Sequence, residues 1–535
     1  MVVFAYPSFF VSSEPFISQS KGMTWDRTEL ENEILLARQR VYRAGSPTPL
    51  ERMELPGFGE IYVKREDVSP IKAYKWRGSF NRMALIEGED RKLPVIAASA
   101  GNHAQGVALA AKILGLRARI YMPTTTPAVK RSAVLEKGGD SVEIVLVGDG
   151  YDDALAAAKE SARSGGVFVH AYDDWQVMAG QATIADEVVL AGKGPFDVAY
   201  LQIGGGGMAA GVATWLKKFY PGIRIVGVEG EGQASMAAAV QAGEPVALKE
   251  LDIFCDGTAV RQAGVLTHRV CAEVIDEFVT VSNEEVSDAI RLYWESLRCL
   301  QEPSGAMGLA GLRKHGALQP FNRALVVACG ANIDFGQLSR ISELAGNGGR
   351  PRRHVRVNIP EREGAMLDLF DRAFEGLSVI DFQYGKTHLD QAWPVFGFFL
   401  TDSELDALFQ KLKASGFDAS RVDESASVRF RAIPCEPGTL TNSVFLEIDF
   451  YERPGALRAF LEDVVRGEAN LCYFNYRYSG ERIGRALVAI EFETAQEREK
   501  FCNDLPFKGS GYRRSRILPE EEAHWLVRGA TTEAP

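Results

Sequence analysis

The sequence predicts a soluble α/β protein with a largely parallel sheet, followed by two similar α+β modules. Two observations carry this prediction. Apolar strand-like runs alternate with helical segments between about residues 60 and 335, which is typical of parallel sheets covered by helices. Beyond residue 354 the chain contains two stretches that resemble each other, which indicates an internal repeat. With 535 residues, the chain is long enough for two to four domains.

Composition excludes several classes of function. The net charge of −11 argues against a nucleic-acid-binding surface and gives no sign of attraction to anionic membranes. Seven cysteines with no CxxC pair indicate a reducing compartment, and we expect a cytoplasmic protein. The seven histidines form no ligand cluster, so we expect no metal. No apolar run reaches the length of a membrane span.

The N-terminal segment, residues 1–22, is apolar and rich in serine. It lacks the early positive charge of a signal peptide, so we interpret it as a loose or partner-packed arm, with an organelle transit role as the alternative. After it, residues 24–46 predict a helix and its exit. The next strands are predicted at 60–67, 93–100, 117–123 and 141–148.

Lys75 lies in the stretch IKAYKWRGSFN, residues 71–81. A lysine in such a stretch is ordinarily a helix residue with a solvated amine. The functional alternative is an amine that forms a Schiff base with an aldehyde cofactor, because desolvation favours the neutral, nucleophilic form. Lys75 alone does not decide between the two interpretations.

The segment 197–232 contains a buried strand, the four glycines Gly204 to Gly207, a helix that starts near Met208, and a second strand. Glycine lets backbone amides approach a phosphate closely, and the helix N-terminus adds partial positive charge at the same point. A phosphate site is therefore predicted here. Gly205, Gly207 and Ala210 also fit GxGxxG/A, with Glu229 ending the next strand, so a dinucleotide site stays open as the alternative.

Three groups of candidate residues directly follow apolar strand runs. Asn102 follows 93–100, Gly204 to Gly207 follow the strand near 200, and Cys329 ends the run that begins at residue 323. Active-site groups of parallel sheets gather at the carboxyl ends of strands. We therefore expect these residues to share one crevice. Helices are predicted at 284–297 and within 302–315.

The stretch GNGGRPRRH, residues 346–354, reads as a linker. Beyond it, Glu361 and Gly364 correspond to Glu452 and Gly455, and FQY at 382–384 corresponds to FNY at 474–476. Each copy predicts a strand, a glycine turn, a helix and a strand. The expected organisation is an arm (1–29), a catalytic domain (30–345), a linker (346–354), a first module (355–431), a connection (432–443), a second module (444–527) and a tail (528–535).

In combination, these motifs resemble the biosynthetic threonine dehydratases, pyridoxal-phosphate enzymes of fold type II. The motifs are KREDVSP, YKWRGS, SAGNHAQGVA, GGGGMAAGVA, EPSGA and CGAN, in this order. The resemblance covers residues 30–527. It implies a two-lobed catalytic domain like that of the tryptophan synthase β chain, followed by two ACT-like regulatory modules.

The resemblance also implies roles for individual residues. Lys75 would hold pyridoxal 5′-phosphate through a Schiff base and later move protons at the substrate Cα. Asn102 would bind the 3′-oxygen of the cofactor, and Cys329 would face its pyridine nitrogen. The amides expected around the phosphate are those of Gly204, Gly205, Gly206, Gly207 and Met208. The residues expected around the substrate carboxylate are Ser99, Gly101, Asn102 and His103.

The implied reaction converts L-threonine to 2-oxobutyrate and ammonia, with L-serine as an alternative substrate. Isoleucine and valine are the implied effectors, and a homotetramer is the implied assembly. Ala73, Trp76, Ser79 and Ala182 depart from the family pattern and leave substrate preference open. Two other functions stay open: a dinucleotide-dependent oxidoreductase and a non-catalytic amino-acid sensor.

Overall fold

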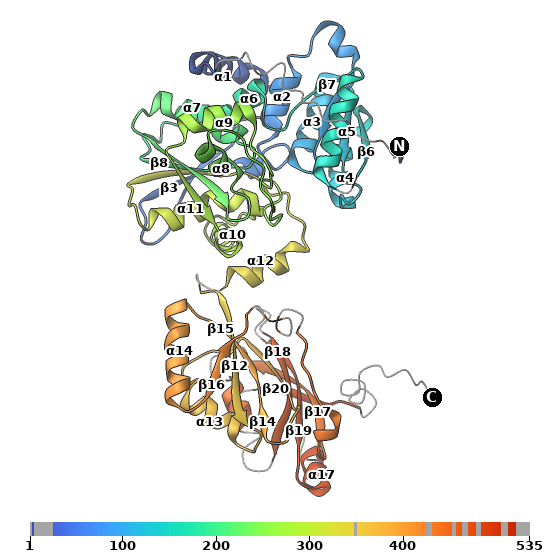
Figure 1. Ribbon diagram of the computed structural model, residues 1–535, viewed down its shortest axis with the longest axis vertical. Helices are drawn as coiled ribbons and strands as arrows, with labels where there is room; N and C mark the ends of the chain where they lie inside the picture. The colour runs from blue at the N-terminus through green and yellow to red at the C-terminus, as the bar shows by residue number, and fades with distance from the viewer. Residues whose placement is uncertain are drawn as a thin grey trace. The chain divides into compact units, whose positions relative to one another are not determined.

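The computed structural model describes residues 3–4, 25–148, 150–346, 350–423, 425, 428, 431–451, 456–462, 469–477, 483–503 and 512–519. The chain divides into two compact units, residues 1–345 and 346–535 (Figure 1). The expected tail and most of the expected arm lie outside the described residues, as do Glu452 and Gly455. Among the described helices, none combines the length and apolarity needed to cross a bilayer.

The first unit contains two sheets. The smaller is parallel throughout and has the order β1 (Val3–Phe4), β6 (Val142–Leu146), β5 (Ala118–Met122), β4 (Val95–Ala98), β7 (Val167–Phe168). The helices of this part of the chain are α2 (Trp76–Met83), α3 (Asn102–Leu114), α4 (Ala128–Gly138) and α5 (Tyr151–Arg163). Buried Ile, Val and Ala side chains of β4 and β5 pack against α3 in one core.

The larger sheet has the order β10 (Glu277–Val281), β9 (Arg224–Gly230), β8 (Val198–Gln202), β11 (Arg323–Ala328), β3 (Glu60–Arg65), β2 (Leu50–Met53). Only the edge strand β2 is antiparallel to its neighbour. Its central strands are buried on both faces, as parallel strands between helix layers are. The helices are α1 (Arg27–Val41), α6 (Trp175–Leu190), α7 (Gly207–Phe219), α8 (Ser235–Ala242), α9 (Val265–Val274), α10 (Asn283–Leu297), α11 (Pro303–Gly316) and α12 (Gln337–Ala345).

The second unit forms one extended antiparallel sheet from two modules. The first contributes β12 (Arg352–Pro360), α13 (Ala365–Arg372), β13 (Asp381–Gly385), β14 (Gln391–Ala392), β15 (Val395–Phe399), α14 (Asp402–Ala414) and β16 (Asp418–Arg421). The second contributes β17 (Val444–Tyr451), α16 (Ala456–Phe460), β18 (Asn470–Arg477), β19 (Ile483–Glu491), α17 (Ala495–Asn503) and β20 (Tyr512–Ile517). Each module thus continues past the predicted strand–turn–helix–strand with a further strand, helix and strand, which completes a ferredoxin-like βαββαβ unit.

The two modules join where β13 pairs with β18. The repeated tripeptides lie opposite each other in reverse order, as Phe382–Tyr476, Gln383–Asn475 and Tyr384–Phe474. Of these three pairs only Gln383–Asn475 joins corresponding residues, and the two flanking pairs exchange Phe and Tyr, so the two modules are related by an approximate two-fold axis near the Gln383–Asn475 pair. Side chains from both modules share one hydrophobic core beneath this seam.

Candidate functional site

The segment that carries Lys75 is hydrogen-bonded to the residues that directly follow β11. The backbone N–H of Tyr74 donates to the Cys329 carbonyl at 3.1 Å, and Ala73 pairs with Gly330 as an isolated β-bridge. Lys75 itself immediately precedes α2, after the turns that follow β3. The lysine is thereby fixed at the end of a central strand, where the sequence predicted an active-site crevice.

The Lys75 amine lies in surroundings that favour its neutral form. Its Nζ donates to the Gly257 carbonyl at 3.0 Å. Burial lowers the pKa of Lys75, although the nearby Glu302, Asp256 and Cys329 oppose that shift. A neutral amine is both a nucleophile and a proton acceptor, so the amine suits attack on an aldehyde and removal of a proton.

The tetraglycine turn links β8 to α7 and lies beside the same Gly257–Thr258 turn. A Cβ on Gly204 would come within 2.8 Å of the Thr258 carbonyl oxygen. Gly206 has φ +91°, a backbone conformation that favours glycine, and α7 starts directly after it. The first amides of α7 lack intrahelical acceptors by geometry, so they are free to bind an anion. The turn therefore offers a phosphate-sized anion only backbone donors.

Tyr172 covers the other side of this turn. A Cβ on Gly205 would lie 2.2 Å from the Tyr172 ring, and one on Gly207 would lie 2.9 Å from its carbonyl oxygen. The Thr267 hydroxyl donates to the Gly205 carbonyl at 2.6 Å and fixes the turn from behind. The four glycines are therefore required by close packing as well as by the predicted ligand.

Gly205→Ala is expected to weaken cofactor binding by about tenfold or more, because the new methyl group displaces either Tyr172 or the turn. Titration of the apo protein with pyridoxal phosphate, followed by absorbance, measures this change. Gly222→Ala is the matched control, since a Cβ there meets nothing within 4 Å. Equal affinity of the two variants would show that the turn does not hold the phosphate.

Cys329 and Met208 lie together at the carboxyl end of β11. The Cys329 thiol donates to the Met208 sulfur at 3.5 Å, and both side chains are buried. Burial raises the pKa of the Cys329 thiol well above its ordinary value, with Glu66 and Glu302 adding to the shift. The thiol therefore stays protonated, so it can form a weak hydrogen bond to a pyridine nitrogen without placing a negative charge beside it.

Asn102, Ser99 and Gly101 form the strand-to-helix turn after β4. The Gly101 amide donates to the Ser99 hydroxyl at 3.2 Å, and Asn102 begins α3. A Cβ on Gly101 would meet nothing within 4 Å, so the turn is open on that side. A half-buried turn that ends in the unpaired amides of a helix N-terminus suits a carboxylate, as the resemblance implies.

The His103 side chain has a different place from the one expected. Its Nε2 lies 3.1 Å from the Val169 carbonyl and its Nδ1 lies 3.2 Å from the Ser79 hydroxyl. Burial lowers the pKa of His103 to about 3, so the ring is neutral. With both ring nitrogens engaged inside the protein, the imidazole is a core residue. Only the backbone amide of His103 remains a candidate for substrate contact.

Glu302 and Asn332 complete the site, and the sequence analysis assigned neither. Glu302 Oε1 accepts a hydrogen bond from Asn102 Nδ2 at 2.7 Å, and Asn332 Nδ2 donates to Asn102 Oδ1 at 2.6 Å. Burial, with Asp256, raises the pKa of Glu302 to about 7. The EPSGA and CGAN motifs contain these two residues and were the available signal, but within them the sequence analysis assigns a role to Cys329 alone.

A network of buried charged side chains holds the segment that carries Lys75 in place. Arg77, two residues after Lys75, has 0% exposure and bonds both Glu66 (2.8 and 2.9 Å) and Glu187 (2.6 and 3.0 Å). Lys64 completes the network at 2.6 Å from Glu187 and 3.3 Å from Glu66. Two cations thus neutralise two carboxylates and join β3, α2 and α6 below the site.

These residues fit pyridoxal phosphate. The chain supplies a desolvated amine, a turn of four glycines whose backbone amides can hold an anion, and a protonated thiol, and shared contacts link the three. Among the described residues, no cluster of three or more His, Cys, Asp or Glu forms a metal site.

Comparison with known families agrees with this geometry. Residues 41–330 match the family of pyridoxal-phosphate dependent enzymes. Residues 438–521 match the C-terminal regulatory domain of threonine dehydratase. The fold and the site therefore define a pyridoxal-phosphate-dependent enzyme with a regulatory domain, which confirms the predicted fold class and cofactor.

Similar proteins show to which family of pyridoxal-phosphate-dependent enzymes the chain belongs. A biosynthetic L-threonine dehydratase of Haemophilus influenzae is 36% identical over 478 residues, which cover 88% of this chain and 92% of that protein. The chloroplastic biosynthetic threonine dehydratase of Arabidopsis thaliana is 32% identical over 95% of this chain and 86% of its own length. The chain belongs to the biosynthetic threonine dehydratase family.

Solved structures support the same assignment. The processed form of threonine deaminase isoform 2 from Solanum lycopersicum superimposes with a TM-score of 0.57 at 36% identity, covering 65% of this chain and all of that one. The maize serine racemase gives a TM-score of 0.53 at 28% identity, covering 58% of this chain and 95% of that one.

The dinucleotide alternative finds no support at Glu229. This residue ends β9, but it is 1% exposed and its carboxylate accepts the amides of Met236 (2.9 Å) and Ala237 (2.8 Å) at the start of α8. A carboxylate engaged in this way cannot bind a ribose hydroxyl without exposing a helix terminus.

Proposed function

We propose that this chain dehydrates and deaminates L-threonine to 2-oxobutyrate and ammonia, the first step of isoleucine synthesis. The observation that carries the proposal is the Lys75 amine, which is desolvated and held at 3.0 Å from Gly257, next to the tetraglycine turn. Membership of the threonine dehydratase family supports the choice of substrate.

When bound, pyridoxal phosphate withdraws electrons from the substrate Cα and so acidifies its hydrogen. The proposed role of Ser99, Gly101 and Asn102 is to hold the substrate carboxylate at the start of α3. The neutral Lys75 amine then accepts the α-hydrogen as a proton. Loss of the β-hydroxyl as water leaves an enamine, whose hydrolysis gives 2-oxobutyrate and ammonia.

The experiment that tests this proposal is ammonia release by the purified holoenzyme from L-threonine and, separately, from L-serine. The expected result is equal amounts of ammonia and 2-oxobutyrate from threonine. Absence of turnover with both amino acids, together with binding of isoleucine, would instead favour the non-catalytic sensor.

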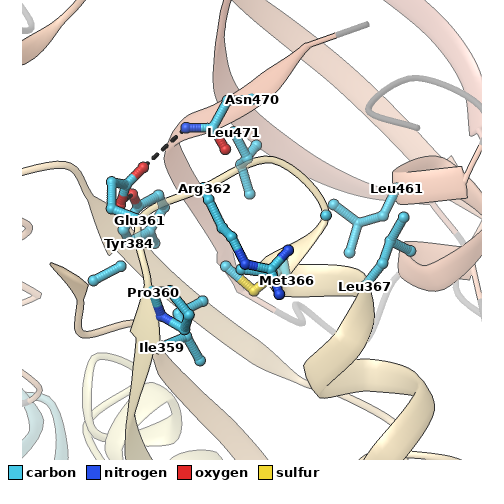
Figure 2. A pocket seen from close by; sticks show the side chains of 13 residues that line it. Ile359, Pro360, Glu361, Arg362, Met366, Leu367, Tyr384, Leu461, Asn470 and Leu471 are labelled. Carbon is cyan, nitrogen blue, oxygen red and sulfur yellow. Dashed lines mark hydrogen bonds between the residues drawn. The ribbon is translucent and has the colours of Figure 1, made fainter. Parts of the chain in front are cut away.

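The regulatory unit contains a pocket suited to an amino-acid effector (Figure 2). It is partly open to solvent and surrounds the glycine turn at Gly364. Residues from both modules line it. The apolar ones are Ile359, Pro360, Ala365, Met366, Leu367, Ala392, Leu461 and Leu471.

Two charged residues, Glu361 and Arg362, are part of the lining of this pocket. Glu361 Oε1 accepts from Asn470 of the second module at 2.9 Å, as the dashed line in Figure 2 shows. Arg362 is exposed and forms an ion pair with Asp368 at 2.7 Å. Surface ion pairs contribute little free energy, so an effector carboxylate can replace Asp368 as the partner of Arg362 at small cost. We propose that Arg362 binds the carboxylate of isoleucine and Glu361 its ammonium group, with valine competing for the same pocket.

Arg362→Ala is expected to weaken inhibition by isoleucine by about tenfold or more, because it removes the carboxylate partner. The concentration of isoleucine that halves threonine turnover measures the change. Lys413→Ala, which removes one exposed positive charge from α14 of the same module, is the control and should leave that concentration unaltered. An unchanged response in Arg362→Ala would contradict the assignment of this pocket.

The family resemblance also supports a homotetrameric assembly, and the seven cysteines without a CxxC pair support a cytoplasmic location. Light scattering of the purified protein tests the first, since a tetramer has four times the mass of one chain.

A further inference from the structure

A row of polar side chains beside Lys75 connects the two sheets. The proposed reaction assigns no role to two of its members, Glu302 and Asn332. Asn102 begins α3 next to the smaller sheet, Glu302 precedes α11, and Asn332 follows β11 of the larger sheet. Asn102 and Glu302 are 8% and 5% exposed, so their 2.7 Å hydrogen bond lies in a region of low dielectric, where such bonds are strong.

The groups at the two ends of this row determine which atom donates and which accepts in each hydrogen bond. Asn332 Nδ2 lies 2.8 Å from the Ile71 carbonyl, which can only accept. The same Nδ2 lies 2.6 Å from Asn102, so the Asn102 atom that faces it is the amide oxygen. The amide nitrogen of Asn102 then faces Glu302, and its N–H donates to Glu302 Oε1.

Glu302 is held in turn by the larger sheet. Its Oε2 accepts the Asn332 backbone N–H at 3.2 Å, and its own backbone N–H donates to the Gly330 carbonyl at 2.9 Å. Both carboxylate oxygens therefore face donors. The charged groups that act on Glu302 are Asp256, Lys75 and Lys130.

The Asn102 amide has two N–H groups, and the hydrogen bonds among the described residues use one of them. We propose that Glu302 is a positioning residue: together with Asn332, it fixes the Asn102 amide so that the remaining N–H is presented to the 3′-oxygen of pyridoxal phosphate. This inference rests on the proposed function, because it requires the cofactor at Lys75.

Such a donor stabilises the ionised form of the 3′-oxygen and lowers the pH at which that oxygen loses its proton. Glu302→Gln replaces one acceptor oxygen by NH₂, which must face a donor, either Asn102 or the Asn332 amide. The expected results are about tenfold weaker binding of pyridoxal phosphate and an upward shift of roughly 0.5–1 pH unit in the midpoint of the visible absorption change. Asn332→Ala removes the hydrogen bonds of its Nδ2 to the Asn102 oxygen and to the Ile71 carbonyl but leaves the Glu302–Asn102 bond in place. It should therefore weaken cofactor binding and raise the absorption midpoint by less than Glu302→Gln does.

A double-mutant cycle separates positioning from a direct role. If Glu302 acts through Asn102, then Glu302→Gln should add nothing to Asn102→Ala in cofactor affinity or in absorption midpoint. Additive effects would overturn the inference, and so would unchanged affinity and midpoint in both Glu302→Gln and Asn332→Ala. If Glu302→Gln does not fold, Asn332→Ala with and without Asn102→Ala carries the same test.

The wild-type protein distinguishes this inference from the proposed function. Uptake of pyridoxal phosphate by the wild type, with no response of the variants, refutes the role of Glu302 alone. Failure of the wild type to take up the cofactor refutes the proposed function and the inference together.

Discussion

Replacement of Lys75 by alanine is expected to lower ammonia release from threonine by at least about 10³-fold, because it removes the group that binds the cofactor covalently and moves the α-hydrogen. The fold should survive, since the one hydrogen bond that Nζ makes to the described residues is that to the Gly257 carbonyl. Steady-state turnover of threonine and the thermal unfolding midpoint of the apo protein measure these two outcomes.

The matched control is Lys72→Asn, three residues earlier. Lys72 is exposed and has φ +56°, a conformation that asparagine adopts more readily than most residues. This variant should keep nearly full turnover. Full threonine turnover in Lys75→Ala would show that another group does the chemistry.

Arg77→Met is expected to destabilise the first unit by about 3–5 kcal/mol, because it leaves two buried carboxylates opposite one lysine. The unfolding midpoint should fall by roughly 5–10 °C, which calorimetry measures. Cofactor affinity should fall as well, since Arg77 lies two residues after Lys75 on the same segment. Arg163→Met is the control, because Arg163 forms a surface pair with Glu160 and such pairs contribute less than about 1 kcal/mol.

The same network predicts how stability depends on pH. Burial alone would raise the pKa of Glu66, but Arg77 and Lys64 outweigh it and hold that pKa at about 2, against an ordinary value of 4.5. Ionised Glu66 therefore contributes stability that is complete above pH 4.5 and is lost as the pH falls toward 2. Arg77→Met should weaken this dependence, and the additional change Glu187→Gln should restore part of the lost stability. Equal midpoints for Arg77→Met and Arg163→Met would refute the role of the network.

Much of the site could be predicted because its residues are grouped in short motifs at strand ends. Asn102, the glycines and Cys329 each follow a strand, and parallel strands place such residues at one edge. The sequence did not indicate that Asn102 belongs to a different sheet from the glycines and Cys329. That separation depends on the pairing of β4 with β5 and β7, which strand patterns alone do not specify.

Most features that the sequence did not predict are contacts between residues far apart in the chain. Glu302 meets Asn102 across 200 positions, and Arg77 meets Glu187 across 110, so neither pair has a local signal. His103 lies next to Asn102 in sequence, but the helix turns its ring toward Val169 and away from the expected substrate. The second half of each regulatory module was missed because the recognisable repeat covers only the glycine turn and its flanking strands.

Reduction of the holoenzyme with borohydride, followed by peptide mapping, tests the central claim most directly. The expected result is loss of the visible absorption band and a single pyridoxyl label on Lys75. A label on any other lysine, or an unlabelled protein that still converts threonine to 2-oxobutyrate and ammonia, would contradict it.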